Sequence, residues 1–169
     1  DASGDSVDID THYPNTHGSG QGISVEYTLT VPRHANVDSI ELVNGNLRIV
    51  DVEGGVAAAC VNGTIRASGL AGRIELESVN GTVELEVGRL DPAGEISVES
   101  VNGGLEIFLP AAAGVAVHAE TVNGSISNDL GLEVRKGRYV GSSMHGIVGS
   151  GATELSLETV NGPISVRAR

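Results

Sequence analysis

Large aromatic side chains are nearly missing from this sequence, which has no Trp, one Phe and three Tyr among 169 residues. The hydrophobic core must therefore be built from Val, Ile, Leu and Ala, and such small side chains suit a narrow coil better than a broad sandwich. Cys60 is the single cysteine, which excludes an intrachain disulfide. No apolar run approaches the roughly 18 residues of a membrane-spanning helix, and no segment has helical spacing of apolar residues.

Positive charge is scarce as well. The chain has 10 Lys and Arg against 22 Asp and Glu, a formal net charge of −12 and a pI of about 4.6. Such a surface repels the phosphates of nucleic acids and anionic lipids, so we expect no nucleic-acid partner. The chain begins at Asp1 rather than Met. We therefore expect a trimmed or mature form, in which the absence of a visible signal peptide carries no information about location.

One tripeptide, Val-Asn-Gly, occurs six times, with its asparagines 18, 18, 22, 21 and 38 residues apart. A period near 20 residues indicates a repeat architecture, and the last interval predicts one coil that lacks the tripeptide. The Asn-Gly pairs are interpreted as structural turns, because Gly adopts positive φ and Asn tolerates it while bonding neighbouring backbone. The predicted turn residues are Asn44, Gly45, Asn62, Gly63, Asn80, Gly81, Asn102, Gly103, Asn123, Gly124, Asn161 and Gly162.

Apolar and polar residues alternate on both sides of each tripeptide, which predicts β-strands. The positions four and six residues before each Asn, and three and five after it, are mostly apolar and are expected to point inward; Asn128 interrupts the last column. We predict an all-β, single-domain β-solenoid, parallel β-helix-like, of about 6–7 coils over residues 23–169, with the asparagines stacked in a hydrogen-bonded ladder. A meander of antiparallel hairpins with Asn-Gly turns is the alternative.

The N-terminal residues precede the repeats. Residues 1–22 are polar and are expected to be flexible, with one short strand around Val7–Asp10. Residues 23–31 alternate apolar and polar side chains up to Pro32, which predicts a half-buried strand that caps the first coil.

A second irregular stretch lies at residues 128–151, where we expect a coil without the tripeptide and with a protruding loop. The final repeat follows it and includes Pro163, which has no N–H to donate to a sheet. This proline predicts that the final repeat is a terminal coil.

Five glutamates occupy the same outward position, three residues before an Asn, and are expected to stack about 4.8 Å apart. Carboxylates in line repel one another, so weak binding of a divalent cation such as Ca²⁺ is a hypothesis, and a plain solvated face is the alternative. The five histidines have no metal-binding spacing, and no cofactor is predicted. The candidate face comprises Glu41, Glu77, Glu99, Glu120 and Glu158.

Basic residues in the irregular segment suggest an interaction loop. Its candidate residues are Arg135, Lys136, Arg138, Tyr139, Met144 and His145.

The repeated Glu/Ser/Thr-x-Val-Asn-Gly-x-Ile units follow a predicted strand that ends at Val31-Pro32, and a Gly-rich segment, 146–151, precedes the final repeat. In these features the sequence resembles a bacterial family of adhesin-like domains of unknown function, related to autotransporter-adhesin head domains. The resemblance covers about residues 23–166. It implies a β-solenoid of the cell envelope and supplies no catalytic motif.

The expected function is a non-enzymatic binding, adhesion or scaffold module that is secreted or located in the cell envelope, periplasmic or extracellular. Its expected partner is an unknown envelope protein or glycan, and self-association through the solenoid ends is a further expectation. One alternative is a polysaccharide-acting β-helix enzyme, in which Glu77 and Glu99 would be paired carboxylates. Another is a purely structural, oligomerising solenoid.

Overall fold

A computed structural model describes residues 2–3, 6–7, 9–11, 24–138 and 140–169. The chain divides into two units, residues 1–30 and residues 31–169. In the first unit β1 (Ala2–Ser3) and β2 (Ser6–Val7) form an antiparallel pair, and β2 overlaps the short strand expected around Val7. The expected flexibility of residues 1–22 falls mostly outside the described residues. No helix occurs in the described part of the chain, so none there could cross a membrane.

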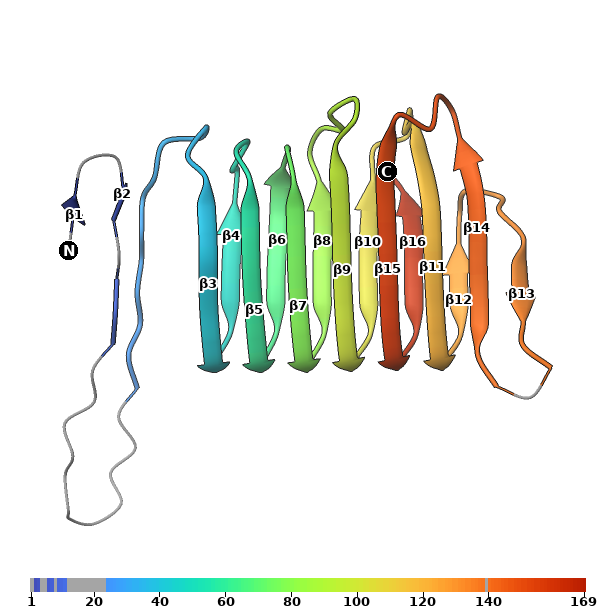
Figure 1. The fold of residues 1–169 in the computed structure, drawn as a ribbon, viewed down its shortest axis with the longest axis horizontal. Helices are drawn as coiled ribbons and strands as arrows, with labels where there is room; N and C mark the ends of the chain where they lie inside the picture. Colours follow the sequence, from blue (N-terminus) through green and yellow to red (C-terminus); the bar gives the residue numbers. More distant parts are fainter. Residues whose placement is uncertain (1, 4–5, 8, 12–23, 139) are drawn as a thin grey trace, which may run out of the picture. The chain divides into compact units, whose positions relative to one another are not determined.

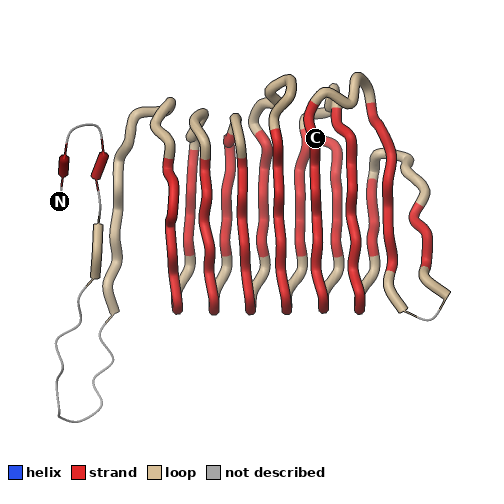
Figure 2. Tube along the Cα trace, viewed as in Figure 1, coloured by secondary structure: helices blue, strands red, loops and turns tan. Residues whose placement is uncertain are grey.

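The second unit consists of two β-sheets, and successive strands up to residue 128 alternate between them (Figures 1 and 2). We call two consecutive strands joined by a Val-Asn-Gly turn a rung. The larger sheet has the order β13-β14-β11-β15-β9-β7-β5-β3 and the smaller sheet β12-β16-β10-β8-β6-β4. The larger sheet contains β3 (Val37–Asn44), β5 (Val56–Asn62), β7 (Ile74–Asn80), β9 (Glu95–Asn102), β11 (Val115–Asn123), β13 (Val134–Lys136), β14 (Ser142–Val148) and β15 (Thr153–Asn161). The smaller contains β4 (Leu47–Val50), β6 (Ile65–Leu70), β8 (Val83–Val87), β10 (Leu105–Leu109), β12 (Ile126–Asn128) and β16 (Ile164–Ala168).

All pairings between rungs are parallel, which confirms the all-β prediction and contradicts the antiparallel meander. Two stacked, mainly parallel sheets are consistent with a β-helix-like fold. The predicted inward columns are buried except at the first rung, where Asp38 is exposed and Ile40 and Leu47 are half-buried, and at Asn128. Each fully buried Leu or Ile contributes roughly 1.5–3 kcal/mol, so the small aliphatic side chains suffice for the core.

The predicted asparagine ladder is present. Five of the six side-chain amides, all but that of Asn44, donate from Nδ2 to Oδ1 of the Asn on the neighbouring rung at 2.9–3.0 Å. The glycines that directly follow the ladder asparagines are also stacked closely on one another in neighbouring rungs. A Cβ added to Gly63, Gly81 or Gly103 would overlap the carbonyl oxygen of the glycine stacked against it. Close approach of neighbouring turns therefore requires glycine here, in addition to the φ of +153° at Gly63 and Gly81.

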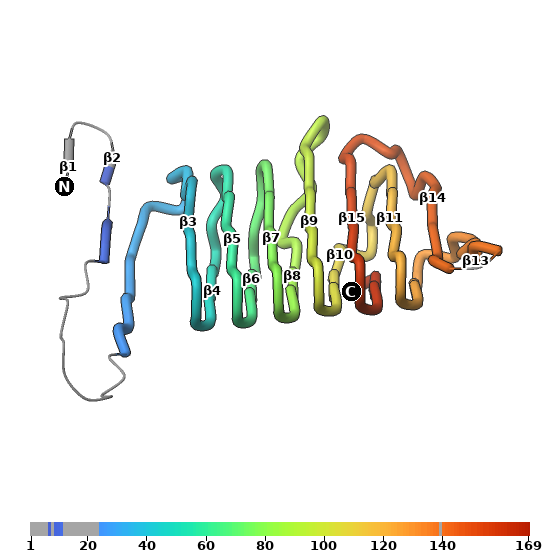
Figure 3. Tube along the Cα trace, turned by 60° about the horizontal axis from the view of Figure 1, so that its bottom comes forward, coloured from blue at the N-terminus to red at the C-terminus, as the bar shows by residue number. Residues whose placement is uncertain are grey.

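The final rung is not terminal, which corrects the expectation drawn from Pro163. Strand β15 pairs with β9 on one side and β11 on the other, and β16 lies between β10 and β12. In Figure 3 the chain leaving β14 passes over β11 to reach β15. Pro163 is tolerated inside the stack because its carbonyl accepts from Leu105 at 2.9 Å, while the next amide, that of Ile164, bonds Ser125. The missing N–H of proline therefore removes no backbone hydrogen bond between neighbouring rungs.

The irregular segment does not form the expected coil. Strand β14 pairs antiparallel with β11, and β13 pairs antiparallel with β14, so both lie in the larger sheet. The smaller sheet ends at β12, because the Asn128 side chain accepts from the amides of Leu130 and Leu132 at 3.0 and 3.1 Å and turns the chain. Leu130, Leu132 and Val134 then pack against the core cluster and cover part of this end.

The strand expected at residues 23–31 is not formed. Ile23 lies outside the described residues, and residues 24–31 belong to no strand and are exposed. An alternating pattern needs a neighbouring strand edge before it becomes a buried face, and no pairing is made here. Capping of the first rung by this segment stays a prediction.

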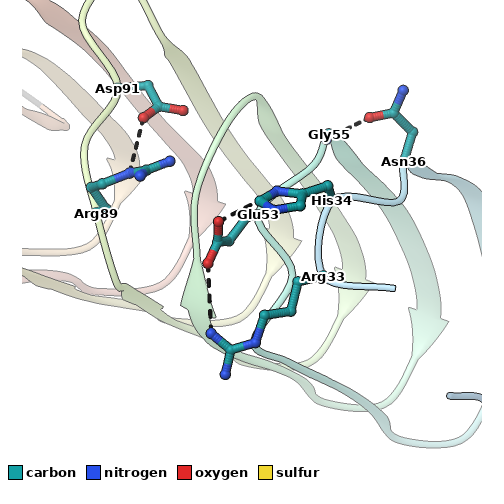
Figure 4. A network of polar contacts seen from close by, with 7 residues as sticks. All are labelled: Arg33, His34, Asn36, Glu53, Gly55, Arg89 and Asp91. Atoms are coloured by element: carbon teal, nitrogen blue, oxygen red, sulfur yellow. Dashed lines mark hydrogen bonds and ion pairs between the residues drawn. The ribbon is translucent and has the colours of Figure 1, made fainter. Parts of the chain in front are cut away.

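In the second unit, residues 33–36 lie over the turn that follows β4 (Figure 4). Glu53 pairs with Arg33 at 3.6 Å and with His34 at 3.4 Å, and the Gly55 amide donates to Asn36 Oδ1 at 2.9 Å. These contacts attach the chain to the first rung just before β3 begins.

Candidate functional site

The predicted glutamate face forms one column on the outer side of the larger sheet. The order of the glutamates in this column differs from their order in the sequence. Glu77 pairs in register with Glu99, Glu99 with Glu158, and Glu158 with Glu120. Glu41 stands apart, because Ala59 occupies the position between it and Glu77. Insertion of β15 therefore creates a run of four adjacent carboxylates, which neighbouring parallel strands hold about 4.8 Å apart.

The glutamates of this column differ from those of the smaller sheet in their partners. On the smaller sheet Glu84 pairs with Arg66 at 3.3 Å and Glu106 with Arg167 at 3.6 Å, and Glu86 pairs with Arg169. Within the described residues, no basic side chain forms an ion pair with Glu77, Glu99 or Glu158. The smaller sheet thus carries compensated charge, whereas the column on the larger sheet carries net negative charge.

Glu99 lies in the middle of this run, and its pKa is raised. The main cause is desolvation by its surroundings, followed by the charges of Glu158, Glu77 and Glu75. Both causes disfavour the ionised carboxylate. A cation placed beside Glu99 would relieve this repulsion.

A stripe of exposed valines runs beside the glutamates, two residues further along each strand, and every member is at least 40 % exposed. Together the two stripes line a groove of about 570 Å³ that crosses β5, β7, β9, β15 and β11 and reaches Gly137, Val140, Gly141 and the start of β14. We call it the acidic groove. Its valines are Val61, Val79, Val101, Val122 and Val160.

The predicted interaction loop meets the groove but is only partly as expected. Arg135 and Lys136 are exposed on β13, and His145 is exposed on β14. Met144 was expected at the surface and is instead fully buried, because alternate residues of β14 point into the core. Arg138 is exposed in the turn, and Tyr139 lies outside the described residues. The turn itself lines the groove through Gly137, Val140 and Gly141.

The structure also brings together residues that the sequence did not connect. His118 on β11 lies opposite His145 on β14, and Glu120 lies beside both. No sequence motif could have revealed this group, because the pairing of β11 with β14 joins positions 27 residues apart. The other described histidine, His34, is not part of this group. It pairs with Glu53 next to the first rung.

Cys60 is buried in an inward column, as expected for a small hydrophobic side chain. Burial raises the pKa of its thiol, and Sγ donates to the Gly45 carbonyl at 3.6 Å. A buried, protonated thiol of this kind is a poor nucleophile.

No family model matches this chain, and neither does any curated protein or solved structure.

Proposed function

We propose that this chain is a β-solenoid binding module of the bacterial cell envelope, periplasmic or extracellular, that acts without catalysis. Its ligand is an extended, basic segment of an envelope protein held in the acidic groove. The observation that carries this proposal is the run of carboxylates at Glu77, Glu99 and Glu158, which has no basic ion-pair partner among the described residues, while the glutamates of the smaller sheet have such partners. The envelope location rests on the resemblance of the repeats to adhesin-like domains.

Charge favours a basic partner. The chain has a net charge of −12, and the raised pKa of Glu99 reflects desolvation and the repulsion of its neighbours. Lysine or arginine side chains would lower this repulsion, and charge complementarity of this kind increases association rates and excludes acidic partners. A polyanion or an acidic peptide is correspondingly disfavoured.

The valine stripe supports a side-chain ligand over a free cation. The aliphatic stems of Lys and Arg cover apolar surface while their charged ends remain at polar groups. Val79, Val101 and Val160 lie one residue before the ladder asparagines, on the same face as the glutamates. A basic segment lying across the strands would contact both stripes at once.

A fluorescently labelled peptide of alternating Lys and Val tests the proposal by fluorescence anisotropy. We expect it to bind the full chain, and a Glu-Val peptide of equal length to show no binding. The double variant Glu99→Gln/Glu158→Gln should weaken binding roughly tenfold, because each partly desolvated charge pair contributes up to about 1 kcal/mol. Ala59→Glu, which fills the gap in the column, should strengthen it.

A matched control separates the groove from the net charge of the protein. Glu84→Gln/Glu106→Gln removes the same charge from the smaller sheet and should change affinity less than twofold. Equal losses in the two double variants would indicate nonspecific attraction and contradict the proposal. Absence of any binding to the Lys-Val peptide would contradict it as well. Calcium titrated alone tests the simpler hypothesis of a cation site on the same glutamates.

One observation favours a second candidate, a polysaccharide-acting enzyme. Glu77 and Glu99 are adjacent in register, and the pKa of Glu99 is raised, which are properties of a carboxylate pair that includes a general acid. Sugar platforms usually contain aromatic side chains, and the groove has none among the described residues that line it. Hydrolysis of a glycan panel that is lost in Glu77→Ala would establish this function in place of binding.

A structural, self-associating scaffold is the remaining expectation. Leu130, Leu132 and Val134 cover part of the end next to β12, so association would use the end formed by β3 and β4. Sedimentation equilibrium tests this, and substitution of the half-buried Leu42 by Lys should abolish any dimer that forms there.

A further inference from the structure

Three metal-ligating side chains converge where β11 and β14 pair antiparallel. This pairing sets His118 opposite His145, and their ring centroids are 4.3 Å apart, with ring planes tilted by 58°. Glu120 follows His118 by two residues and therefore projects from the same face of β11. Its Oε1 lies 3.7 Å from His118 Nε2 and 3.6 Å from His145 Nε2.

The distances between these atoms suit an ion better than direct hydrogen bonds. Both exceed the roughly 2.7–3.2 Å of an N–H···O bond, and one ligand atom from each residue lies within 4.8 Å of the other two. Tetrahedral zinc with bonds of about 2.0–2.2 Å keeps its ligands roughly 3.3–3.5 Å apart. The side chains of His118, His145 and Glu120 are 42, 47 and 54 % exposed, so small rotations can close the remaining gap and an ion can enter from solvent.

We infer that His118, Glu120 and His145 form a transition-metal site, for which zinc is the expected ion. Imidazole nitrogens favour zinc, copper and nickel, whereas calcium and magnesium favour sites made of oxygen ligands alone. Three protein ligands leave a fourth position for water or another group. Glu158 on β15 lies beside Glu120 and adds negative charge next to the ion.

The position of the site indicates its consequence for the fold. Strand β14 belongs to the antiparallel pair of strands at this end of the larger sheet, and its neighbours are β11 and β13. A bound ion adds coordination bonds between β14 and β11. Because the three ligands meet only in the folded chain, zinc binding stabilises the folded state by mass action. This inference does not depend on a basic ligand in the acidic groove.

Isothermal titration calorimetry of the metal-free full chain with zinc chloride tests the site. We expect one ion per chain and a rise in the thermal unfolding temperature that calcium chloride does not produce. His118→Ala or His145→Ala should each weaken binding at least about tenfold, since even residues that only orient a metal ligand contribute 10–100-fold. Cobalt(II) used in place of zinc should give a visible absorption spectrum that either variant alters.

Two controls address the other histidines. His34→Ala removes a histidine that pairs with Glu53 at 3.4 Å (Figure 4) but joins no three-ligand group among the described residues. His12→Ala/His17→Ala removes the two histidines outside the described residues. Both variants should bind zinc like the original chain.

A third variant separates coordination from packing. His145→Asp keeps a ligand atom at this position and should retain more zinc binding than His145→Ala, with circular dichroism showing that both remain folded. Unchanged binding in the His118 and His145 variants would overturn the proposal. Equal loss in the His34 or His12/His17 variants would overturn it too. If the original chain binds zinc as expected but does not bind the Lys-Val peptide, only the function proposed for the groove is contradicted.

Discussion

The side chain of Asn161 donates a hydrogen bond to Oδ1 of Asn102 at 2.9 Å, across 59 residues of sequence. Asn123 donates in turn to Asn161, also at 2.9 Å. The ladder asparagine that comes last in the sequence, Asn161, therefore lies between the fourth and the fifth, Asn102 and Asn123. This insertion makes the ladder continuous and also places Glu158 between Glu99 and Glu120.

Ladder asparagines should differ in their contribution to stability according to position. Asn80 donates to Asn62 and accepts from Asn102, whereas Asn44 only accepts from Asn62. Each net hydrogen bond contributes roughly 0.5–1.5 kcal/mol. We expect Asn80→Ala to lower the free energy of unfolding by about 1–2 kcal/mol and Asn44→Ala by about half as much, measured by urea denaturation. Equal effects would show that the ladder bonds are not the source of the loss.

Turn glycines should tolerate substitution only where neighbouring rungs leave room. A Cβ at Gly81 would overlap the Gly63 carbonyl, whereas a Cβ at Gly131 would meet nothing within 4 Å. Gly131 has a φ of +73°, so alanine there carries backbone strain alone, of about 1–2 kcal/mol. Gly81→Ala should destabilise the protein by more than about 3 kcal/mol or prevent folding. Thermal unfolding of the two variants checks this difference.

Two buried serines should be replaceable without loss of stability. The hydroxyl oxygens of Ser78 and Ser100 are buried and have no hydrogen-bond partner in the described part of the chain, while Thr159, at the same repeat position, donates to the Gly103 carbonyl at 3.1 Å. Removing an unpaired buried hydroxyl relieves a desolvation penalty. We expect Ser100→Ala to be neutral or to stabilise by up to about 1 kcal/mol, and Thr159→Val to destabilise by about 1 kcal/mol. Chemical denaturation decides between these signs.

Glu99 should make the protein less stable as the pH rises. Its pKa is raised in the folded state, so the folded chain holds this proton more tightly than the unfolded chain does. The stability contributed by the protonated form is therefore complete below the ordinary glutamate pKa and is lost as the pH rises through the raised value. Glu99→Gln, which mimics the protonated side chain, should raise the unfolding temperature at neutral pH, and the gain should vanish in acid.

Glu41→Gln provides the control for this pH dependence, because Glu41 has the same repeat position but faces Ala59. The Glu41→Gln variant should have the same unfolding temperature as the original chain at every pH. A gain for Glu99→Gln that persists unchanged in acid would contradict the electrostatic explanation.

The C-terminal rung should exchange its amide hydrogens as slowly as an interior rung. Strands β15 and β16 are the last two in sequence order, yet each has a parallel neighbour on each side. Native-state hydrogen exchange should give β15 protection comparable to that of β7. Rapid exchange in β15, typical of fraying termini, would contradict the inserted arrangement.

Within the rungs, the sequence alone determined which side chains are inward and which are outward, and where the Asn-Gly turns lie. Alternation at period two assigns every residue of a strand to a face, so the columns that contain Ile65, Leu85 and Leu157 were predictable, as was the asparagine ladder. The same reasoning failed at residues 24–31, where the alternation is present but no strand edge is paired.

Only the tertiary structure decided the order of the rungs. Every rung carries the same pattern, so any rung satisfies the hydrogen bonds and core contacts of any other, and local sequence cannot specify its neighbours. The order depends on the connections and on Asn128, which turns the chain away from the smaller sheet and into β13 and β14. The strand order places Glu99 next to Glu158 and His118 opposite His145. The residues of each pair are distant in the sequence, so the sequence alone did not reveal either pair.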